Sequence, residues 1–454
     1  MNPSKTSLLR QLGLVSATAL VISNMVGTGI FTTTGFLAGD LGDPSIVLGI
    51  WVVGAIVALA GAICYSELGI NFPSSGGEYV YLTEAYGPTW GFMEGWISFT
   101  AGFSAPIALA ALAFSDYLGY FFPGVKQASS TAIGPFTVGG AQAVATVLIV
   151  AFAALNLFGI RLASSVQNVL TAVKLSVIVG FLVFAFAIGK GDWGNFSQVA
   201  VRTSTSPLWE QFATSLIFIY VAYSGWNAAT YVAEELRTPE RTLPLALTLG
   251  TTLVAALFVG LNIAYIYAQP LEQMKGVVAV GSLSASNLFG PEVASLFSGL
   301  MAVSLLATVN AMVTIGPRVY YAMAQNKAFF PAAARVHERW RTPYVAIGMQ
   351  GACAVAMCFL SFRDLMFYVG FLLNAFSVLA VASLFVFRKR VSWQRLGVVD
   401  FAWPLVPGFY VLVGAWVAGS GFLMRPGVSA AALGTVVVGA IAYKIFLAPK
   451  AVAS

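Results

Sequence analysis

Long apolar stretches separated by short polar segments recur along almost the whole chain. Each stretch is close to the roughly 20 residues that an α-helix needs to cross a hydrocarbon core about 30 Å thick. The pattern predicts an all-α polytopic membrane protein, a single domain with twelve transmembrane helices. The twelve expected spans are residues 12–38, 45–66, 89–121, 140–159, 163–189, 209–234, 243–268, 290–325, 343–361, 364–387, 403–424 and 427–447.

The composition supports this class. Of the 454 residues, 59% are hydrophobic and only 9% are charged, and a mean hydropathy of +0.85 does not describe a soluble surface. The three cysteines, Cys64, Cys353 and Cys358, lie inside apolar runs and indicate no disulfide framework. We expect the first stretch to be mature structure, because it continues past Gly39 without the cleavage pattern of a signal peptide.

The net charge of +6 is spread over short clusters between the apolar stretches, so it does not indicate a nucleic-acid surface. If the N-terminus is cytoplasmic, fifteen of the 23 lysines and arginines fall in inside segments and six in outside segments. The other two, Lys174 and Arg318, fall within spans. This bias predicts that both termini are cytoplasmic in a multi-pass protein of the cell membrane. The bilayer is the expected partner, and whether an accessory subunit or an oligomer is needed stays open.

Two spans contain a glycine-rich interruption. The first span carries Gly27-Thr28-Gly29 about midway, and the sixth carries Ser224-Gly225 between apolar turns. An unpaired backbone group costs several kcal/mol in lipid, so such breaks persist only where they are buried in protein or line a cavity. Close packing of small residues is the alternative explanation, and it suits one break better than two.

Breaks at corresponding positions of two halves indicate an inverted-repeat transporter with its site at the midplane. The first repeat would be residues 12–189 and the second residues 209–387, with two further spans in residues 403–447. A broken helix offers free N–H groups and a positive dipole end to a carboxylate, and unwound carbonyls suit an ammonium. A zwitterionic amino acid carries both groups, so two facing breaks can hold its backbone without a charged side chain.

The residues at these breaks resemble the LAT-type branch (L-amino acid transporters and serine/threonine exchangers) of the amino acid/polyamine/organocation superfamily. The resemblance rests on residues 27–31, on residues 223–227 running into residues 234–244, and on residues 73–79. It implies a leucine-transporter-type fold of five-plus-five inverted repeats with two additional C-terminal helices. The substrate-binding residues that it implies are Met25, Gly27, Thr28, Gly29, Ile30, Val221, Ala222, Ser224, Gly225 and Asn227.

By this resemblance, Thr28 and the amides of Thr28 and Gly29 take the substrate carboxylate. The ammonium goes to backbone carbonyls, and Asn227 is a polar neighbour of the site. The carbonyls concerned are those of Met25, Val221, Ala222 and Ser224. Thr28 stands where serine is common, and Val221 stands at a position where an aromatic gate is usual.

Lys174 lies near the middle of the fifth span, where an ionised lysine costs roughly 2.5–3.5 kcal/mol. We expect it to face protein or water, because it starts too far from either interface to snorkel. The resemblance gives it a coupling or conformational role, with its ammonium where sodium-coupled relatives bind an ion between spans one and eight. It therefore implies a sodium-independent carrier, either an exchanger or a proton symporter.

Other polar residues give weaker signals. Asn310 and Asn374 could line the cavity or form interhelical hydrogen bonds. We expect four glutamates to be solvated caps or ion-pair partners at cytoplasmic helix ends, with an inner-gate role left open; these are Glu67, Glu78, Glu234 and Glu235. The single histidine, His337, falls in a loop and argues against a metal site or a histidine-based catalytic centre.

The leading hypothesis is a sodium-independent permease or exchanger of neutral L-amino acids that works by alternating access, without cofactor or metal. A polyamine or other organic-cation permease is the main alternative, although it should place carboxylates in the cavity and the mid-span residues show none. A channel would favour repeated pore helices or charged rings. An intramembrane enzyme would need a nucleophile with a base at membrane depth. The chain has no P-loop motif that would indicate ATP hydrolysis.

Overall fold

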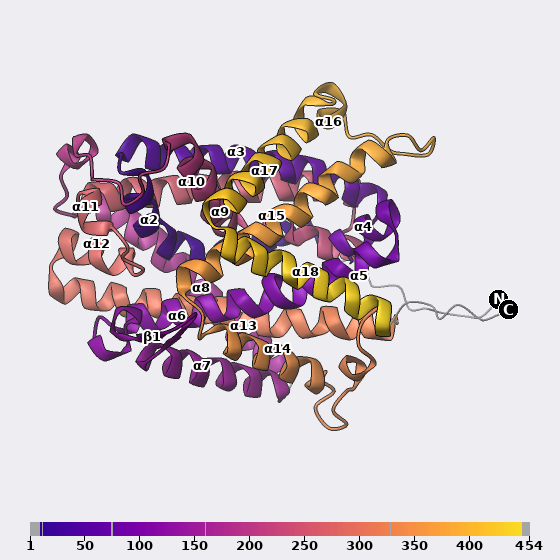
Figure 1. Ribbon diagram of the computed structural model, residues 1–454, viewed down its shortest axis with the longest axis horizontal. Coiled ribbons are helices and arrows are strands. Elements are labelled where there is room, and N and C mark those ends of the chain that lie inside the picture. Colours follow the sequence, from indigo (N-terminus) through magenta and orange to yellow (C-terminus); the bar gives the residue numbers. More distant parts are fainter. Residues whose placement is uncertain (1–9, 11, 74–75, 159, 327, 447–454) are drawn as a thin grey trace.

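The computed structural model describes residues 10, 12–73, 76–158, 160–326 and 328–446, which fold into a helical bundle (Figure 1). The first half of the chain holds helices α1 (Leu14–Met25), α2 (Thr28–Leu41), α3 (Pro44–Asn71), α4 (Glu78–Tyr86), α5 (Pro88–Ile97), η1 (a π-helix, Ser98–Ser104), α6 (Ala105–Leu118), α7 (Gly140–Leu157) and α8 (Ile160–Ala187). Between α6 and α7 lie the short helices η2 (Pro123–Val125) and η3 (Gln127–Ser129) and an antiparallel hairpin of β1 (Thr131–Ile133) and β2 (Phe136–Val138).

The second half is also helical. It holds η4 (Trp193–Ser197), α9 (Leu208–Tyr223), η5 (Ala228–Glu235), α10 (Pro239–Ala268), α11 (Leu271–Met274), α12 (Val280–Phe289), α13 (Pro291–Gln325), η6 (Pro331–Ala334), α14 (Tyr344–Met357), α15 (Phe362–Phe387), α16 (Gly397–Phe401), α17 (Leu405–Met424) and α18 (Pro426–Phe446). Figure 1 places α2, α11 and α12 at one end of the bundle and α4 and α5 toward the other, with long helices such as α13 running between them.

The long helices are apolar enough to cross a membrane. Among the described residues, nine helices satisfy the length and hydropathy of a span, and the bent pair α1 and α2 makes a tenth. Two expected spans are shorter. The sixth is divided into the 16-residue α9 and the short η5, and the ninth is the 14-residue α14. The protein is therefore a multi-pass membrane protein, and the count of twelve stays a prediction.

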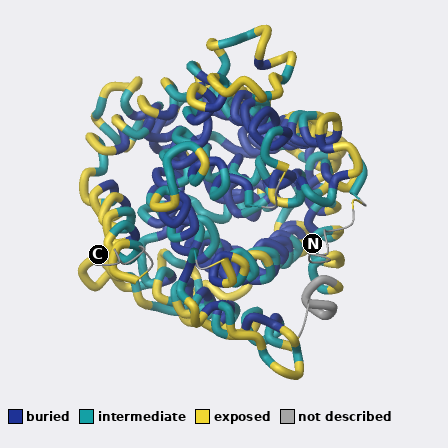
Figure 2. Tube along the Cα trace, turned by 90° about the vertical axis from the view of Figure 1, so that its right-hand side faces the viewer, coloured by how far each residue is buried: buried dark blue, intermediate teal, exposed yellow. Residues whose placement is uncertain are grey.

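Burial divides the bundle into an inside and an outside. The buried stretches gather in its interior, and the exposed ones lie on the outer layer (Figure 2). Helix α2 is buried at every residue, in contact with α9 and α3. In contrast, α7, α8, α17 and α18 turn large apolar side chains outward, among them Val147, Val183, Leu412 and Val437. An apolar outer surface of this extent is what contact with lipid requires.

Candidate substrate site at two broken helices

The first span breaks between α1 and α2. Helix α1 ends at Met25, Val26 has φ −73° and ψ 87°, Gly27 has an extended backbone, and α2 begins at Thr28 at 42° to α1. The interruption thus covers Val26 and Gly27, while Thr28 and Gly29 form the first turn of α2. The N–H groups of Thr28, Gly29 and Ile30 have no acceptor within their own helix and lie at its positive end.

The sixth span breaks after α9. The helix ends at Tyr223, Ser224 is extended with ψ 150°, and Gly225 has φ +95°, which favours glycine. The carbonyl of Val221 accepts hydrogen bonds from the amide and the hydroxyl of Ser224, at 3.2 and 2.7 Å. Of the four carbonyls expected to take the ammonium, that of Val221 therefore already has two donors within the turn.

The two breaks lie against each other. A Cβ at Gly29 would come within 2.3 Å of the Cα atom of Ala222, and one at Gly225 would come within 2.9 Å of the carbonyl carbon of Asn24. Glycine is required at both crossings, because a side chain at either would overlap the opposite backbone. Gly27 has more room and faces Thr308 of α13, at 3.9 Å from the position that a Cβ would take.

Lys174 of α8 reaches the same break from the other side. Its side chain is buried, with 1% of the residue exposed, and its Nζ donates hydrogen bonds to the carbonyls of Ser23 at 3.0 Å and Val26 at 2.6 Å. The carbonyl end of α1 carries a partial negative charge, which favours a cation there. The expectation that Lys174 faces protein is confirmed. The lysine fastens α8 to the break in the first span.

The two asparagines behave differently. Asn310 is buried and donates to Gln167 of α8 at 2.9 Å, and it accepts from Asn156 of α7 at 3.3 Å, so it forms interhelical hydrogen bonds. Asn374 donates to the carbonyl of Gly414 of α17 at 2.9 Å. Asn374 also lines a small cavity of about 20 Å³ beside α9, with Tyr223 and Trp226 in its wall, which has room for one water molecule.

Glu78, at the start of α4, is buried rather than solvated, which corrects the expectation from the sequence. Its carboxylate accepts from Tyr65, from Tyr231 at 2.9 Å, and from Asn227 at 3.3 Å. Ser377 of α15 also donates to it, at 3.3 Å. Asn227 thus faces Glu78, and the two link the segment after the second break to α3, α4 and α15.

Glu94 of α5, near one end of the expected third span, is a second buried carboxylate. Its Oε1 accepts from Ser98 at 3.1 Å, while its Oε2 has no hydrogen-bond partner among the described residues. The carboxyl group lies close to that of Glu78. The sequence showed both glutamates, but it could not show that a short helix and a span bring them together.

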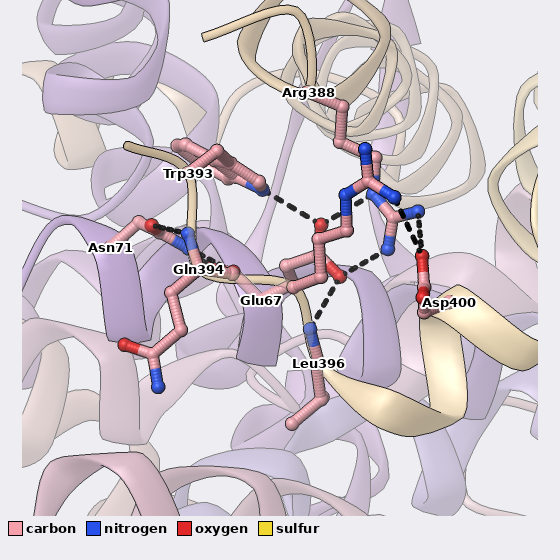
Figure 3. Close-up of polar contacts among 8 residues, drawn as sticks. Glu67, Asn71, Arg388, Trp393, Gln394, Leu396 and Asp400 are labelled. Atoms are coloured by element: carbon pink, nitrogen blue, oxygen red, sulfur yellow. Dashed lines mark hydrogen bonds and ion pairs between the residues drawn. The ribbon is translucent and has the colours of Figure 1, made fainter. Parts of the chain in front are cut away.

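Glu67, near the end of α3, is also buried, and it anchors the polar cluster of Figure 3. Both of its oxygens bond to the guanidinium of Arg388, at 2.6 Å each, and they also accept from Trp393 at 2.9 Å and from the amide of Leu396 at 3.0 Å. Burial alone lowers the pKa of Arg388, but Glu67 and Asp400 reverse this effect and raise it. The cluster ties α3 to the end of α15 and to the segment after it.

A further ion pair joins α2 to α15 at the opposite end of the bundle. Arg363 binds both carboxylate oxygens of Asp40, at 2.5 and 2.6 Å, and the side chain of Asp40 is 2% exposed. The guanidinium also lies over the rings of Phe36 and Phe218. No local motif marks Asp40 in the sequence, because its partner is 323 residues away along the chain.

Comparison with known proteins gives a consistent result. The amino acid permease family matches residues 12–448. The serine/threonine exchanger SteT of Bacillus subtilis is 30% identical over 431 residues, which are 93% of this chain and 92% of the relative. The large neutral amino acids transporter small subunit 2 of Mus musculus is 29% identical over 88% of this chain and 74% of its own. The human b(0,+)-type amino acid transporter 1 is 30% identical over 78% and 70%.

Proposed function

The chain belongs to the amino acid permease family, and we propose that it is a sodium-independent secondary transporter that moves neutral L-amino acids by alternating access. Amino acid transport itself follows from the family and from the relatives. The observation that carries the finer proposal is the direct contact of the two broken helices, where Gly29 meets Ala222 and Gly225 meets Asn24. This contact would bring the first-turn amides of α2 close to carbonyls at the ends of α1 and α9.

The order of the helices supports a five-plus-five repeat. The broken α1 and α2 correspond to α9 and η5, and the 28-residue α3 corresponds to the 30-residue α10. In each half a short helix, α4 or α12, ends at a glycine with positive φ, Gly87 or Gly290. The proline that follows this glycine begins the third long span of that half. Then α7 and α8 correspond to α14 and α15, while α17 and α18 stand outside the repeat.

We assign the substrate backbone to the two breaks. The first-turn amides of α2, at Thr28, Gly29 and Ile30, would hold the carboxylate, because they lie at the positive end of the helix. The carbonyls of Met25, Ala222 and Ser224 would hold the ammonium. Val221 would contribute its side chain rather than its carbonyl, since Ser224 already bonds that oxygen twice.

Sodium independence is supported by the position of the Lys174 ammonium. Sodium-coupled transporters with broken helices bind the ion on unwound carbonyls and half-helix C-terminal ends. In this chain the carbonyls of Ser23 and Val26, at the C-terminal end of α1, bond to Nζ instead. Because the ammonium of Lys174 already neutralises the partial negative charge of these carbonyls, they would not bind a sodium ion. Lys174 would then link the break to α8 and so transmit movement of α1.

Alternating access requires a closure on either side of the site, and we assign the two closures to two sets of contacts. At one end, Asp40 of α2 pairs with Arg363 of α15. At the other end, the backbone of Leu12 forms hydrogen bonds with those of Glu235 and Arg237. There Glu78 of α4 also forms hydrogen bonds with side chains of α3, α15 and the segment after the second break. Opening to one side would break one set of contacts while the other persists.

The buried carboxylates favour one second candidate. The oxygens of Glu78 accept from four side chains, but Oε2 of Glu94 has no partner among the described residues. A free carboxylate oxygen is suited to a cationic group, which keeps a polyamine or other organic-cation permease as the alternative. Exchange measurements separate the two, because a polyamine lacks the carboxylate that the first turn of α2 would hold.

The test is counterflow in proteoliposomes loaded with single amino acids or with putrescine, with and without sodium and a pH gradient. We expect saturable exchange of neutral L-amino acids that is unaffected by sodium, and no exchange of putrescine. Exchange of putrescine alone would transfer the assignment to the organic-cation class. If no amino acid drives exchange or uptake under any gradient, the proposal fails.

A further inference from the structure

An open hollow of about 410 Å³ lies between the end of α15 and the start of α17, near the cluster of Figure 3. Five residues line it: Phe385, Arg388, Lys389, Arg395 and Trp403. Three are basic, two are aromatic, and none is acidic. The volume is within the range of pockets that hold small molecules.

The hollow lies at a membrane surface. Helices α15 and α17 both have the length and hydropathy of spans, and α15 ends at Phe387 while α17 begins at Leu405. Between them, α16 exposes Val398 at 60% and Phe401 at 95%, and Leu405 follows at 74%. Large apolar side chains beside basic ones are typical of a segment that lies in the headgroup region with its apolar side toward the acyl chains.

The charges of the hollow are only partly balanced within the protein, because its three basic side chains have only two acidic partners, Glu67 and Asp400. Residues 385–405 carry four basic side chains and a single acidic one, Asp400. Arg388 forms ion pairs with Glu67 and Asp400, and its Cζ lies 4.2 Å from the centroid of the Trp403 ring. Lys389 is exposed and forms no ion pair within the described part of the chain, and Arg395 is 3.6 Å from Asp400 in an exposed pair. Such a pair contributes little, so Lys389 and Arg395 can bind an external anion.

We propose that this hollow binds the phosphate group of an anionic phospholipid. Lys389 and Arg395 contact the phosphate, and Arg388, fixed by Glu67 and stacked on Trp403, forms the rigid wall. The acyl chains lie along Phe385 and Leu405 toward the bilayer. Arginine and lysine are the side chains that bind phosphate groups, and basic pockets between spans are suited to charged lipid headgroups.

A lipid fits better than a dissolved anion because apolar surface lies near the basic side chains. A soluble phosphate would need only the basic side chains, whereas Phe401 and Leu405, each two residues from the lining residue Trp403, expose large apolar side chains. A bound lipid covers that surface and neutralises the charge together. The site lies apart from the broken helices, so the proposal is independent of the substrate assignment.

The test uses the full chain purified in detergent, and native mass spectrometry measures retention of phosphatidylglycerol and phosphatidylcholine. One variant combines Lys389→Gln with Arg395→Gln. The control combines Arg335→Gln with Arg339→Gln, which removes the same charge from an exposed loop after η6. We expect the wild type and the control to retain phosphatidylglycerol selectively. The first variant should lose affinity by roughly fivefold for each basic residue removed.

Three results would overturn the proposal. The wild type could retain both lipids equally, the control could lose as much as the hollow variant, or inorganic phosphate at millimolar concentration could displace the lipid. The last would identify a site for dissolved anions. Because Lys389 and Arg395 are exposed, we expect all variants to keep the thermal transition of the wild type. Lys389→Glu alone offers a second test and should also abolish selectivity.

Discussion

At the scale of single residues, the most informative side chain is Lys174. A buried ammonium is costly, and this one is compensated by the carbonyls of Ser23 and Val26 at the end of α1. Hydrogen bonds to a charged group contribute about 1.5–3 kcal/mol, so the lysine fixes the geometry of the break. We therefore propose that the lysine acts in the transport cycle, in addition to packing α8 against the first break.

We predict that Lys174→Ala abolishes or severely impairs uptake without unfolding the protein, because the carbonyls at the break lose their donor. Uptake at matched abundance in the membrane is the measurement, with the thermal transition as the control for folding. Wild-type uptake by a normally abundant mutant would reject this role.

A second prediction concerns the glycines of the first break. Gly29→Ala places a Cβ 2.3 Å from the backbone of Ala222, whereas Gly27→Ala finds its nearest neighbours at 3.9 Å. Because the backbone of Ala222 cannot move aside as a flexible side chain can, we expect Gly29→Ala to lower the free energy of unfolding by about 1–3 kcal/mol. Gly27→Ala is the matched control and should keep wild-type thermal stability in detergent. Equal stability of the two variants would contradict the close crossing of α2 and α9.

The sequence reveals the breaks at the residue scale but not the partners of the buried charges. Glycine and serine in an apolar run are visible locally, and so is a lysine in mid-span. Glu78 and Glu67 look like helix-end residues, because Ser377 and Arg388, which help to bury them, lie 299 and 321 residues further along the chain. Only the packing of α3 and α4 against α15 brings these groups together.

At the scale of elements, α2 and α15 are held together by one ion pair, and its surroundings suggest a gate. Helix α2 is buried along its whole length, and its end meets the residues after η4, where Ala200 donates to the carbonyl of Gly42 at 2.7 Å. Movement of this end must break the pair of Asp40 with Arg363. Because we place half of the proposed site on α2, we infer that the pair controls access from that side.

We predict that Asp40→Asn favours the state open on the side of this pair, since Arg363 loses its anionic partner. In a cysteine-free background with Gly39→Cys, a membrane-impermeant thiol reagent should label that position faster, and exchange should slow. Asp364→Asn is the control, because it breaks the neighbouring pair with Arg425 at 2.6 Å, which does not involve α2. Equal labelling of the two variants would argue against a gate at Asp40.

At the scale of the whole molecule, hydropathy predicts the class of protein and most of its helices, and it is least accurate where function interrupts them. Helix α3 matches residues 45–66 closely, and α13 matches residues 290–325. Hydropathy alone makes the sixth span one segment over residues 209–234. The serine and glycine within it predict the division at Ser224 and Gly225, where the backbone leaves the helical conformation. The pattern of apolar residues indicates which surfaces face lipid, whereas the two breaks lie away from those surfaces.

The central claim is that the two breaks together recognise the backbone of an amino acid. Its most direct test is counterflow of the best substrate against two analogues with the same side chain, a methyl ester that lacks the carboxylate and an α-keto acid that lacks the ammonium. We predict that only the zwitterion exchanges, because the first turn of α2 and the carbonyls of α1 and α9 each need their own charged group. Exchange of either analogue at the rate of the parent amino acid would contradict the account.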